Sequence, residues 1–376
     1  MTYSNKTLGV LKTIPGILLM FSIAVLTMGG EDLGIPWPGL ESYLKINSLT
    51  KTFFVDVLRL NYILLCILIG MLIGNLFTLP RWIMAGVSTS RLFIKLGVIL
   101  LGSLYSLADV AKLGFTAIIL ITTFIILTLF FTLWLGKRTG MDPSSAAVLA
   151  AGTAVCGVSA IVATAPAVRA KTTDVVFSIA TILTFGVVSI FVFPFIGHLL
   201  ELSPHQFGVW AGTGILSSGQ VLAVCLIFDP GTANHASESL KTGEIYNLAR
   251  VLFLPFVVLG LAAITTRTAK LPDDEINIHT GLASKFPVFV IGFLAMVFLT
   301  SLGFFGQSSP PSPELITIRK LYNWFFAIGL TGLGMQISFS ELTRAGGKPL
   351  LVGSAAALLK AVLALIVVLL LIPEQP

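Results

Sequence analysis

Charged residues are scarce in this sequence. Asp, Glu, Lys and Arg make up 11% of the 376 residues, whereas hydrophobic residues make up 56%. A soluble domain of this length does not need so much apolar sequence, because surface-to-volume scaling limits its core. The net charge of +6 does not indicate nucleic-acid binding, since Lys and Arg lie mainly in short connections between apolar runs. The composition excludes a soluble protein and predicts that lipid is the solvent for most of the chain.

Residues that hold metals or perform catalysis are also few. The three cysteines, Cys66, Cys156 and Cys225, lie inside apolar runs without a CxxC pair, and the four histidines are not clustered. The sequence contains neither an HExxH motif nor a Walker A motif, and its aspartates fall near the ends of apolar segments. These absences argue against a disulfide framework, a metal site, a bound cofactor and an intramembrane enzyme.

Long apolar runs are abundant, and we predict one membrane domain over residues 1–376. Each run has roughly twenty residues, enough to cross a hydrocarbon layer of ~30 Å as a helix. Two further stretches, 143–168 and 204–228, are crowded with Gly, Ser, Thr, Pro and Ala, which lipid tolerates only where protein or a water-filled cavity satisfies the backbone. The nine predicted spans are 10–30, 57–79, 92–108, 114–136, 174–200, 243–266, 286–306, 317–337 and 349–372.

Two sequence repeats indicate an internal duplication. Residues 97–114 read GVILLGSLYSLADVAKLG and residues 329–346 read GLTGLGMQISFSELTRAG. A weaker pair, GTAVCGVSAIVA at 152–163 and GTGILSSGQVLA at 212–223, lies on the two unusual stretches. The repeats predict two similar halves, roughly 57–200 and 204–372.

The repeats also constrain topology. If all eleven segments crossed the membrane, one pair would be inverted and the other parallel, and a single duplication cannot give both relations. If 143–168 and 204–228 are re-entrant hairpins, both pairs are inverted and more Lys and Arg face the cytoplasm. We therefore favour hairpins with the N-terminus inside, and full broken helices are the alternative. The prediction is an all-α polytopic membrane protein of 9–11 transmembrane segments, with inverted repeats and two interrupted or re-entrant elements.

Four motifs resemble the YeiH-type sulfate exporter family: KLGVILLG (95–102), AGTAVCGVSAIVATAPAVRAK (151–171), FGVWAGTGILSSGQVLA (207–223) and LARVLFLP (248–255). The resemblance implies a distant relation to the bile-acid symporter and sodium–proton antiporter superfamily, with two interrupted elements crossing at the substrate site. It also implies an anionic substrate such as sulfate, sulfite or an organosulfonate. This chain departs from the family in having Leu216 and Ser217 where a His-Glu pair is usual, and Leu104 where an arginine is common.

The candidate binding site combines the polar residues of the two unusual stretches with two cations. Hydroxyls, an amide and unshielded backbone groups at helix breaks suit an anion, while Lys95 and Arg250 would set the sign of its charge. Close packing of small residues is the structural alternative, and Lys95 could simply reach the membrane surface. The candidate residues are Thr153, Cys156, Gly157, Ser159, Thr213, Ser217, Ser218, Gly219, Gln220, Lys95 and Arg250.

These features predict a secondary transporter of the inner membrane that exports or exchanges a small anion by alternating access. A sodium- or proton-coupled symporter of an organic acid is the alternative within transport. An intramembrane enzyme and a channel are the remote alternatives. The expected partners are a small anionic solute and the lipid bilayer; the coupling ion is unknown, and the sequence leaves a homodimer open.

Overall fold

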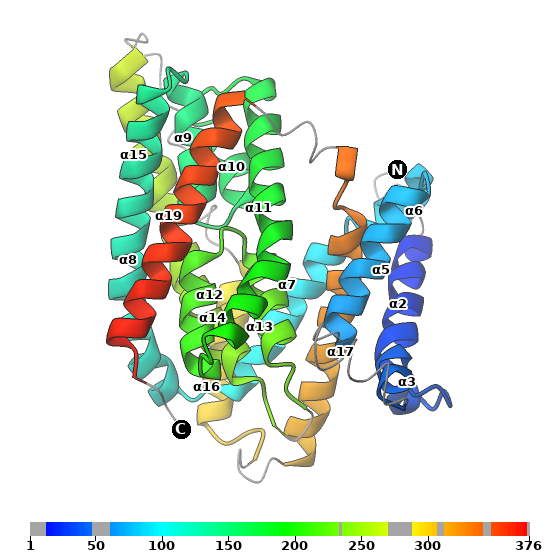
Figure 1. Cartoon of the computed structure of the whole chain (residues 1–376). Helices are drawn as coiled ribbons and strands as arrows, with labels where there is room; N and C mark the ends of the chain where they lie inside the picture. The colour runs from blue at the N-terminus through cyan, green and yellow to red at the C-terminus, as the bar shows by residue number, and fades with distance from the viewer. Residues whose placement is uncertain are drawn as a thin grey trace, which may run out of the picture. The chain divides into compact units, whose positions relative to one another are not determined.

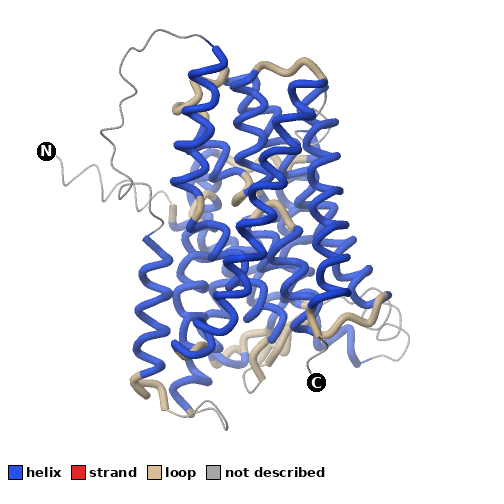
Figure 2. Tube along the Cα trace, turned by 90° about the vertical axis from the view of Figure 1, so that its left-hand side faces the viewer, coloured by secondary structure: helices blue, strands red, loops and turns tan. Residues whose placement is uncertain are grey.

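The computed structural model describes residues 13–46, 61–232, 235–269, 288–306, 312–340 and 347–373. Within these ranges the chain consists of helices and loops without a strand (Figure 2). Five helical stretches are long and apolar enough to cross a membrane: Arg81–Leu104, Gly114–Arg138, Thr172–Leu199, Glu238–Thr265 and Gly347–Leu371. Shorter apolar helices accompany them. The predicted all-α polytopic membrane architecture is confirmed.

The chain divides into two compact units, and each unit contains parts of both predicted halves. The first unit comprises 1–106, 226–237 and 291–339, and the second comprises 107–225, 238–290 and 340–376. Helices of the first unit (Figure 1) are α2 (Ile14–Met28), α3 (Leu40–Ile46), α5 (Tyr62–Leu76), α6 (Arg81–Val87), α7 (Ser90–Leu101) and α17 (Pro313–Met335), with most of α16 (Val288–Ser301).

Helices α7 and α17, which contain the starts of the two copies of the first repeat, pack against each other in the first unit. A Cβ atom added to Gly97 of α7 would lie 2.3 Å from the Phe326 ring of α17, and one added to Gly332 would lie 2.6 Å from Cβ of Ser90. Because Gly97 contacts Phe326 while the earlier Ser90 contacts the later Gly332, the two helices pack antiparallel. The later part of the second copy, 341–346, lies outside the described residues.

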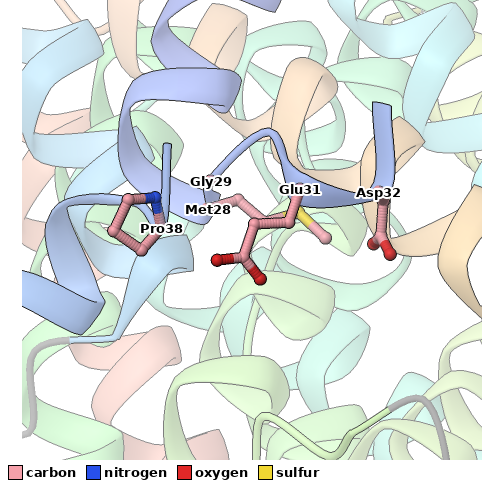
Figure 3. A pocket seen from close by; sticks show the side chains of 5 residues that line it. All are labelled: Met28, Gly29, Glu31, Asp32 and Pro38. Carbon is pink, nitrogen blue, oxygen red and sulfur yellow. The ribbon is translucent and has the colours of Figure 1, made fainter. Parts of the chain in front are cut away.

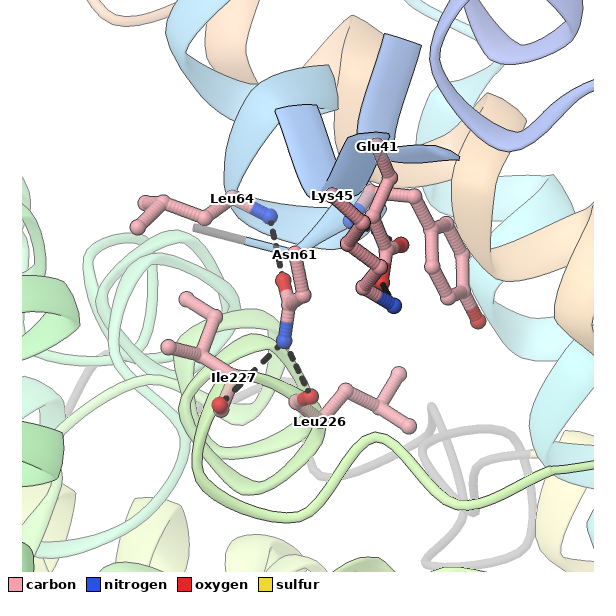
Figure 4. A network of polar contacts seen from close by, with 7 residues as sticks. Glu41, Lys45, Asn61, Leu64, Leu226 and Ile227 are labelled. Carbon is pink, nitrogen blue, oxygen red and sulfur yellow. Dashed lines mark hydrogen bonds and ion pairs between the residues drawn. The ribbon is translucent and has the colours of Figure 1, made fainter. Parts of the chain in front are cut away.

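Asn61 ties together two helix ends in the first unit (Figure 4). Its side-chain oxygen accepts a hydrogen bond from the Leu64 N–H at the start of α5, 3.0 Å away. Its amide nitrogen donates to the carbonyl oxygens of Leu226 and Ile227, at 2.9 and 3.2 Å. These carbonyls belong to the last turn of α13 (Ser218–Phe228), where an intrahelical partner is missing. One side chain thus caps both helices.

The second unit contains the first unusual stretch and residues 204–225 of the second, and each stretch is folded as two short helices. Residues 143–168 form α9 (Pro143–Ala154) and α10 (Val158–Thr164), and residues 204–228 form α12 (Pro204–Gly214) and α13. Figure 1 shows α9 and α10 in the upper half of this unit, and α12 and α13 in its lower half. The longer helices around them are α8 (Leu107–Arg138), α11 (Thr172–Leu199), α14 (Glu238–Leu252), α15 (Leu254–Ala269) and α19 (Gly347–Leu371).

Each helix pair returns toward its starting point. Asp142, which precedes α9, forms a 3.1 Å ion pair with Lys171, which follows α10. Near the other pair, a Cβ atom added to Gly243 of α14 would lie 2.7 Å from Sγ of Cys225 late in α13 and 3.2 Å from the carbonyl oxygen of Gly208 early in α12. Both pairs therefore have the geometry of hairpins, as the parity of the repeats favoured.

This geometry yields a topology prediction. Cysteines introduced at Arg138 and Ala170 are expected to react from the same side of the membrane, and cysteines at Ser203 and His235 from the opposite side. The measurement is labelling with a membrane-impermeant maleimide in intact cells and in inverted vesicles, with the native cysteines removed. Labelling from different sides within either pair would contradict the hairpin arrangement.

Candidate functional site

The two hairpins touch at the points where their helices break. Between α9 and α10, Val155 has φ −107° and ψ −92°, and Gly157 has φ 72° and ψ −126°. A Cβ atom added to Gly157 would lie 3.0 Å from Cβ of Ser217, which lies in the break between α12 and α13. The C-terminal ends of α9 and α12 and the N-terminal ends of α10 and α13 therefore meet at a single crossing.

Replacing Gly157 by alanine is expected to destabilise the protein. The positive φ of Gly157 is unfavourable for any residue with a side chain, and the cost of such backbone strain is about 1–3 kcal/mol. The measurement is thermal unfolding of purified protein in detergent. Gly114→Ala on α8 is the matched control, since no atom lies within 4 Å of the added carbon. Equal stability of the two variants would show that the break tolerates a side chain.

Close packing of α12 and α14 brings Arg250 to this crossing. A Cβ atom added to Gly208 would lie 2.6 Å from the carbonyl oxygen of Ser239, and one added to Gly212 would lie 2.6 Å from that of Gly243. Small residues at these positions let the two backbones approach, as in other membrane helix pairs. Arg250 near the end of α14 thereby reaches the C-terminal end of α12.

Arg250 is fully buried and belongs to a polar network along α14. Its guanidinium donates to the carbonyl oxygen of Ile215 at the break, and donates at 3.0 Å to Oδ1 of Asn247. The Asn247 amide donates at 3.2 Å to both carboxylate oxygens of Glu244. The relative exposures of Arg250, Asn247 and Glu244 are 0%, 2% and 1%. A buried acid and a buried base are thus joined through one amide.

Lys360 bonds to carbonyl oxygens at the break of the first hairpin, as Arg250 does at the break of the second. It lies in the middle of α19, is 2% exposed, and donates to the carbonyl oxygens of Thr153 and Ala154 at 3.1 and 3.4 Å. The Trp210 indole donates at 2.9 Å to the carbonyl oxygen of Ala361, the residue after Lys360, and so connects α12 to this part of α19. A cation therefore binds the negative end of each half-helix, where carbonyls lack intrahelical partners.

The charges at the crossing do not balance. Lys360 lies within electrostatic range of Arg250, and the Cys156 thiol lies within range of both. Among the buried side chains that the structure describes, Glu244 is the only carboxylic acid. A buried charge is costly unless it is paired, so two cations and one acid leave an environment that favours an anion.

Of the predicted site residues in the second unit, most lie in or next to the two breaks. Thr153, Cys156, Thr213 and Gln220 are buried, and Ser217, Ser218 and Gly219 are half-buried. The Thr153 hydroxyl already bonds to the carbonyls of Leu149 and Ala150, each at 3.1 Å. Ser159 is exposed on α10. Lys95 belongs to the first unit, where its side chain on α7 is exposed.

Several polar atoms at the crossing lack a hydrogen-bond partner among the described residues. They are Nε of Arg250, the hydroxyls of Thr213 and Ser218, and the side-chain oxygen of Gln220. Buried polar groups without partners are rare in native structures, and an absent ligand or water is one explanation. Three of the four can donate a hydrogen bond to an anion.

Sequence reasoning missed part of this network. Lys360 was not among the predicted site residues, and neither were Asn247 and Glu244. The signal for Lys360 was a lysine in the middle of an apolar run, where a charge needs a reason. For α14 it was the spacing of 244, 247 and 250, which places all three side chains on one helix face.

The first unit offers a different kind of pocket, shown in Figure 3, lined by Met28, Gly29, Glu31, Asp32 and Pro38. Glu31 and Asp32 belong to a short 3-10 helix after α2. Asp32 pairs with Lys320 of α17 at 2.6 Å, and both partners are partly exposed. Asp32, one of the two carboxylates of this pocket, is therefore already paired with a lysine near the surface, where such pairs contribute little free energy.

Comparison with known proteins gives a matching family and several similar membrane proteins. Residues 15–353 match a family described as Conserved hypothetical protein 698. The chain belongs to this family. A UPF0324 membrane protein of Nitratidesulfovibrio vulgaris is 48% identical over 328 residues, covering 86% of this chain and 88% of the relative. A second one from the same organism is 38% identical, with coverages of 96% and 94%, and one from Bartonella henselae is 30% identical, with coverages of 94% and 92%.

The family match and the UPF0324 relatives support the YeiH-type family that the four motifs predicted, and they support a multi-pass membrane protein. No solved structure matches the chain. The geometry of the crossing therefore comes from this chain alone.

Proposed function

We propose that this protein is a secondary transporter of the inner membrane, with its N-terminus in the cytoplasm, that exports or exchanges a small anion by alternating access. The substrate class is sulfate, sulfite or an organosulfonate. The observation that carries the proposal is the pair of buried cations, Arg250 and Lys360, at the crossing of two broken hairpins.

Substrate sites of transporters are often built from broken helices, whose free backbone groups and dipoles face the ligand. The crossing supplies such groups at the start of α13, together with donors of Arg250, Thr213 and Ser218 that have no partner in the described part of the chain. An oxyanion has acceptors on several sides, so it could use these donors at once. We include Lys360 in the proposed site together with those predicted residues that lie at the crossing, which excludes the exposed Lys95 and Ser159.

A thermal-shift screen of the purified full-length protein tests the proposal. Methanesulfonate and sulfate are expected to raise the unfolding temperature, because a ligand of the native state stabilises it by about 2.7 kcal/mol at 100 times its Kd. Dimethyl sulfone, a neutral compound of similar shape, is the matched control and should have no effect. Stabilisation by carboxylates with sodium but not by sulfur oxyanions would instead support the organic-acid symporter.

Transport itself is measured in proteoliposomes. Radiolabelled sulfate is expected to exchange across the membrane when the protein is present, and the exchange should be inhibited by unlabelled methanesulfonate. Binding without any exchange would contradict a transporter and favour a receptor-like role.

A further inference from the structure

Glu244 is the buried acid that the proposed transport site does not yet explain. It is 1% exposed, and its carboxylate receives hydrogen bonds from the Asn247 amide at 3.2 Å to each oxygen. Removing an ionised carboxylate from water is costly unless charge and hydrogen bonds compensate. A single shared amide group is a weak set of donors for such a carboxylate.

Glu244 and Arg250 are linked through the side chain of Asn247. Asn247 directs its amide nitrogen to the acid and its oxygen to the guanidinium, which is the orientation that lets both bonds form. Arg250 is also the charged group that acts electrostatically on Glu244. A change in the charge of Glu244 therefore reaches the guanidinium that holds the break at Ile215.

Other ionisable groups around Glu244 are few among the described side chains. Its own helix carries Glu238, Lys241 and Tyr246 as well as Arg250. The neighbouring helices α12 and α13 supply His205, which bonds Thr242 at 3.0 Å, and Cys225. The ionisable groups among the described side chains of α8, Lys137 and Arg138, are exposed in its last turn. The described side chains of α15, Leu254–Thr265, contain no ionisable group.

We propose that Glu244 takes up a proton when a dianion occupies the site and stays ionised when a monoanion does. The proposal rests on the proposed function. With Arg250 and Lys360 charged, a dianion neutralises both cations. An ionised Glu244 would then leave the site with one uncompensated negative charge. A monoanion leaves one positive charge, which an ionised Glu244 balances. Because the site is buried, charge imbalance is penalised strongly, and a proton from water removes it.

The sign of the pH dependence follows from this coupling. Protonation of Glu244 favours the dianion, so the affinity for sulfate falls as pH rises, by about tenfold per pH unit where one full proton is taken up. The affinity for methanesulfonate does not fall in this way. Both probes keep their own charge across the range used, from about pH 5 to about pH 8, in which an unperturbed histidine also titrates.

Calorimetry on the purified full-length protein measures the proton directly. Titrations in two buffers with different ionisation enthalpies are expected to give uptake of about one proton per sulfate bound and none per methanesulfonate. This contrast uses the native chain, so it does not depend on any variant folding. Equal proton uptake for the two anions would overturn the proposal while leaving the transporter intact.

The variant Glu244→Gln identifies the proton carrier. It is expected to bind sulfate with an affinity independent of pH and without proton uptake. His205→Gln and Glu238→Gln are the matched controls, and both should retain the proton uptake. If Glu244→Gln takes up a proton with sulfate as the native chain does, the assignment to Glu244 is wrong. If the native chain binds neither anion, the proposed function fails and this inference fails with it.

Discussion

Arg250→Gln is expected to weaken sulfate binding by about 30-fold or more, equivalent to about 2 kcal/mol. Arg250 is fully buried, its Nε has no partner among the described residues, and its other donors hold the carbonyl of Ile215 and the side chain of Asn247. Glutamine removes both the positive charge and the planar set of donors. Calorimetric titration of the purified variant with sulfate measures the effect.

The same change is also expected to destabilise the fold, because it leaves Glu244 buried without its cation. Leaving buried hydrogen-bonding groups without their partner in this way costs about 1–3 kcal/mol for each group. The double variant Glu244→Gln, Arg250→Gln removes both charges and should recover much of the stability without recovering sulfate binding. Normal binding by the folded double variant would show that Arg250 does not contact the anion.

Arg250→Lys refines this test. Lysine keeps the positive charge but has a compact ammonium group in place of the planar guanidinium. We expect the sulfate affinity of Arg250→Lys to lie between the affinities of the native chain and of Arg250→Gln. The positive charge at position 250 is kept, while the directed donors of the guanidinium are lost. An affinity equal to that of Arg250→Gln would indicate that hydrogen-bond geometry outweighs charge at this position.

Lys360→Met is expected to have the second large effect, on stability as well as on sulfate binding. Methionine has a similar length but no charge and no donor, so the carbonyls of Thr153 and Ala154 would lose their partner at a buried helix end. Leaving buried acceptors unpaired costs about 1–3 kcal/mol. Thermal unfolding and sulfate titration measure the two effects.

Lys348→Met is the matched control for this change. Lys348 lies in the first turn of the same helix, is exposed, and donates at 2.7 Å to the carbonyl of Gly140. Its removal should leave sulfate affinity unchanged and stability nearly so, because solvent can replace it. If both lysine variants bind sulfate normally, the buried cation of α19 has only a structural role.

The sequence predicted the long helices well, because apolar length is a strong signal in a membrane protein. The predicted spans 174–200 and 349–372 correspond to α11 (Thr172–Leu199) and α19 (Gly347–Leu371). The prediction was poorer where polar residues belong to a helix. The helical stretch containing the predicted span 92–108 starts at Arg81, since α6 precedes α7 with only a short interruption at 88–89.

The breaks were also predictable, because Gly, Ser and Thr concentrate where an uninterrupted helix would be unfavourable. The helix ends at Ala154 and Gly214 fall inside the stretches predicted to be interrupted. The partners of the breaks were not predictable. Lys360 lies some 200 residues after α9 in the chain, and a nearly all-apolar helix gives no periodic signal for the face that a single lysine occupies.

Backbone recognition at the crossing has a consequence for mutational tolerance. Lys360 and Arg250 bond to main-chain oxygens of Thr153, Ala154 and Ile215, which every amino acid possesses. Side chains at 153, 154 and 215 can therefore change identity without deleting these contacts, provided that their size and packing are kept. In a saturation library selected for folding, we expect few substitutions to be tolerated at positions 157, 250 and 360. Positions 153, 154 and 215 should accept a wider range of small or aliphatic residues.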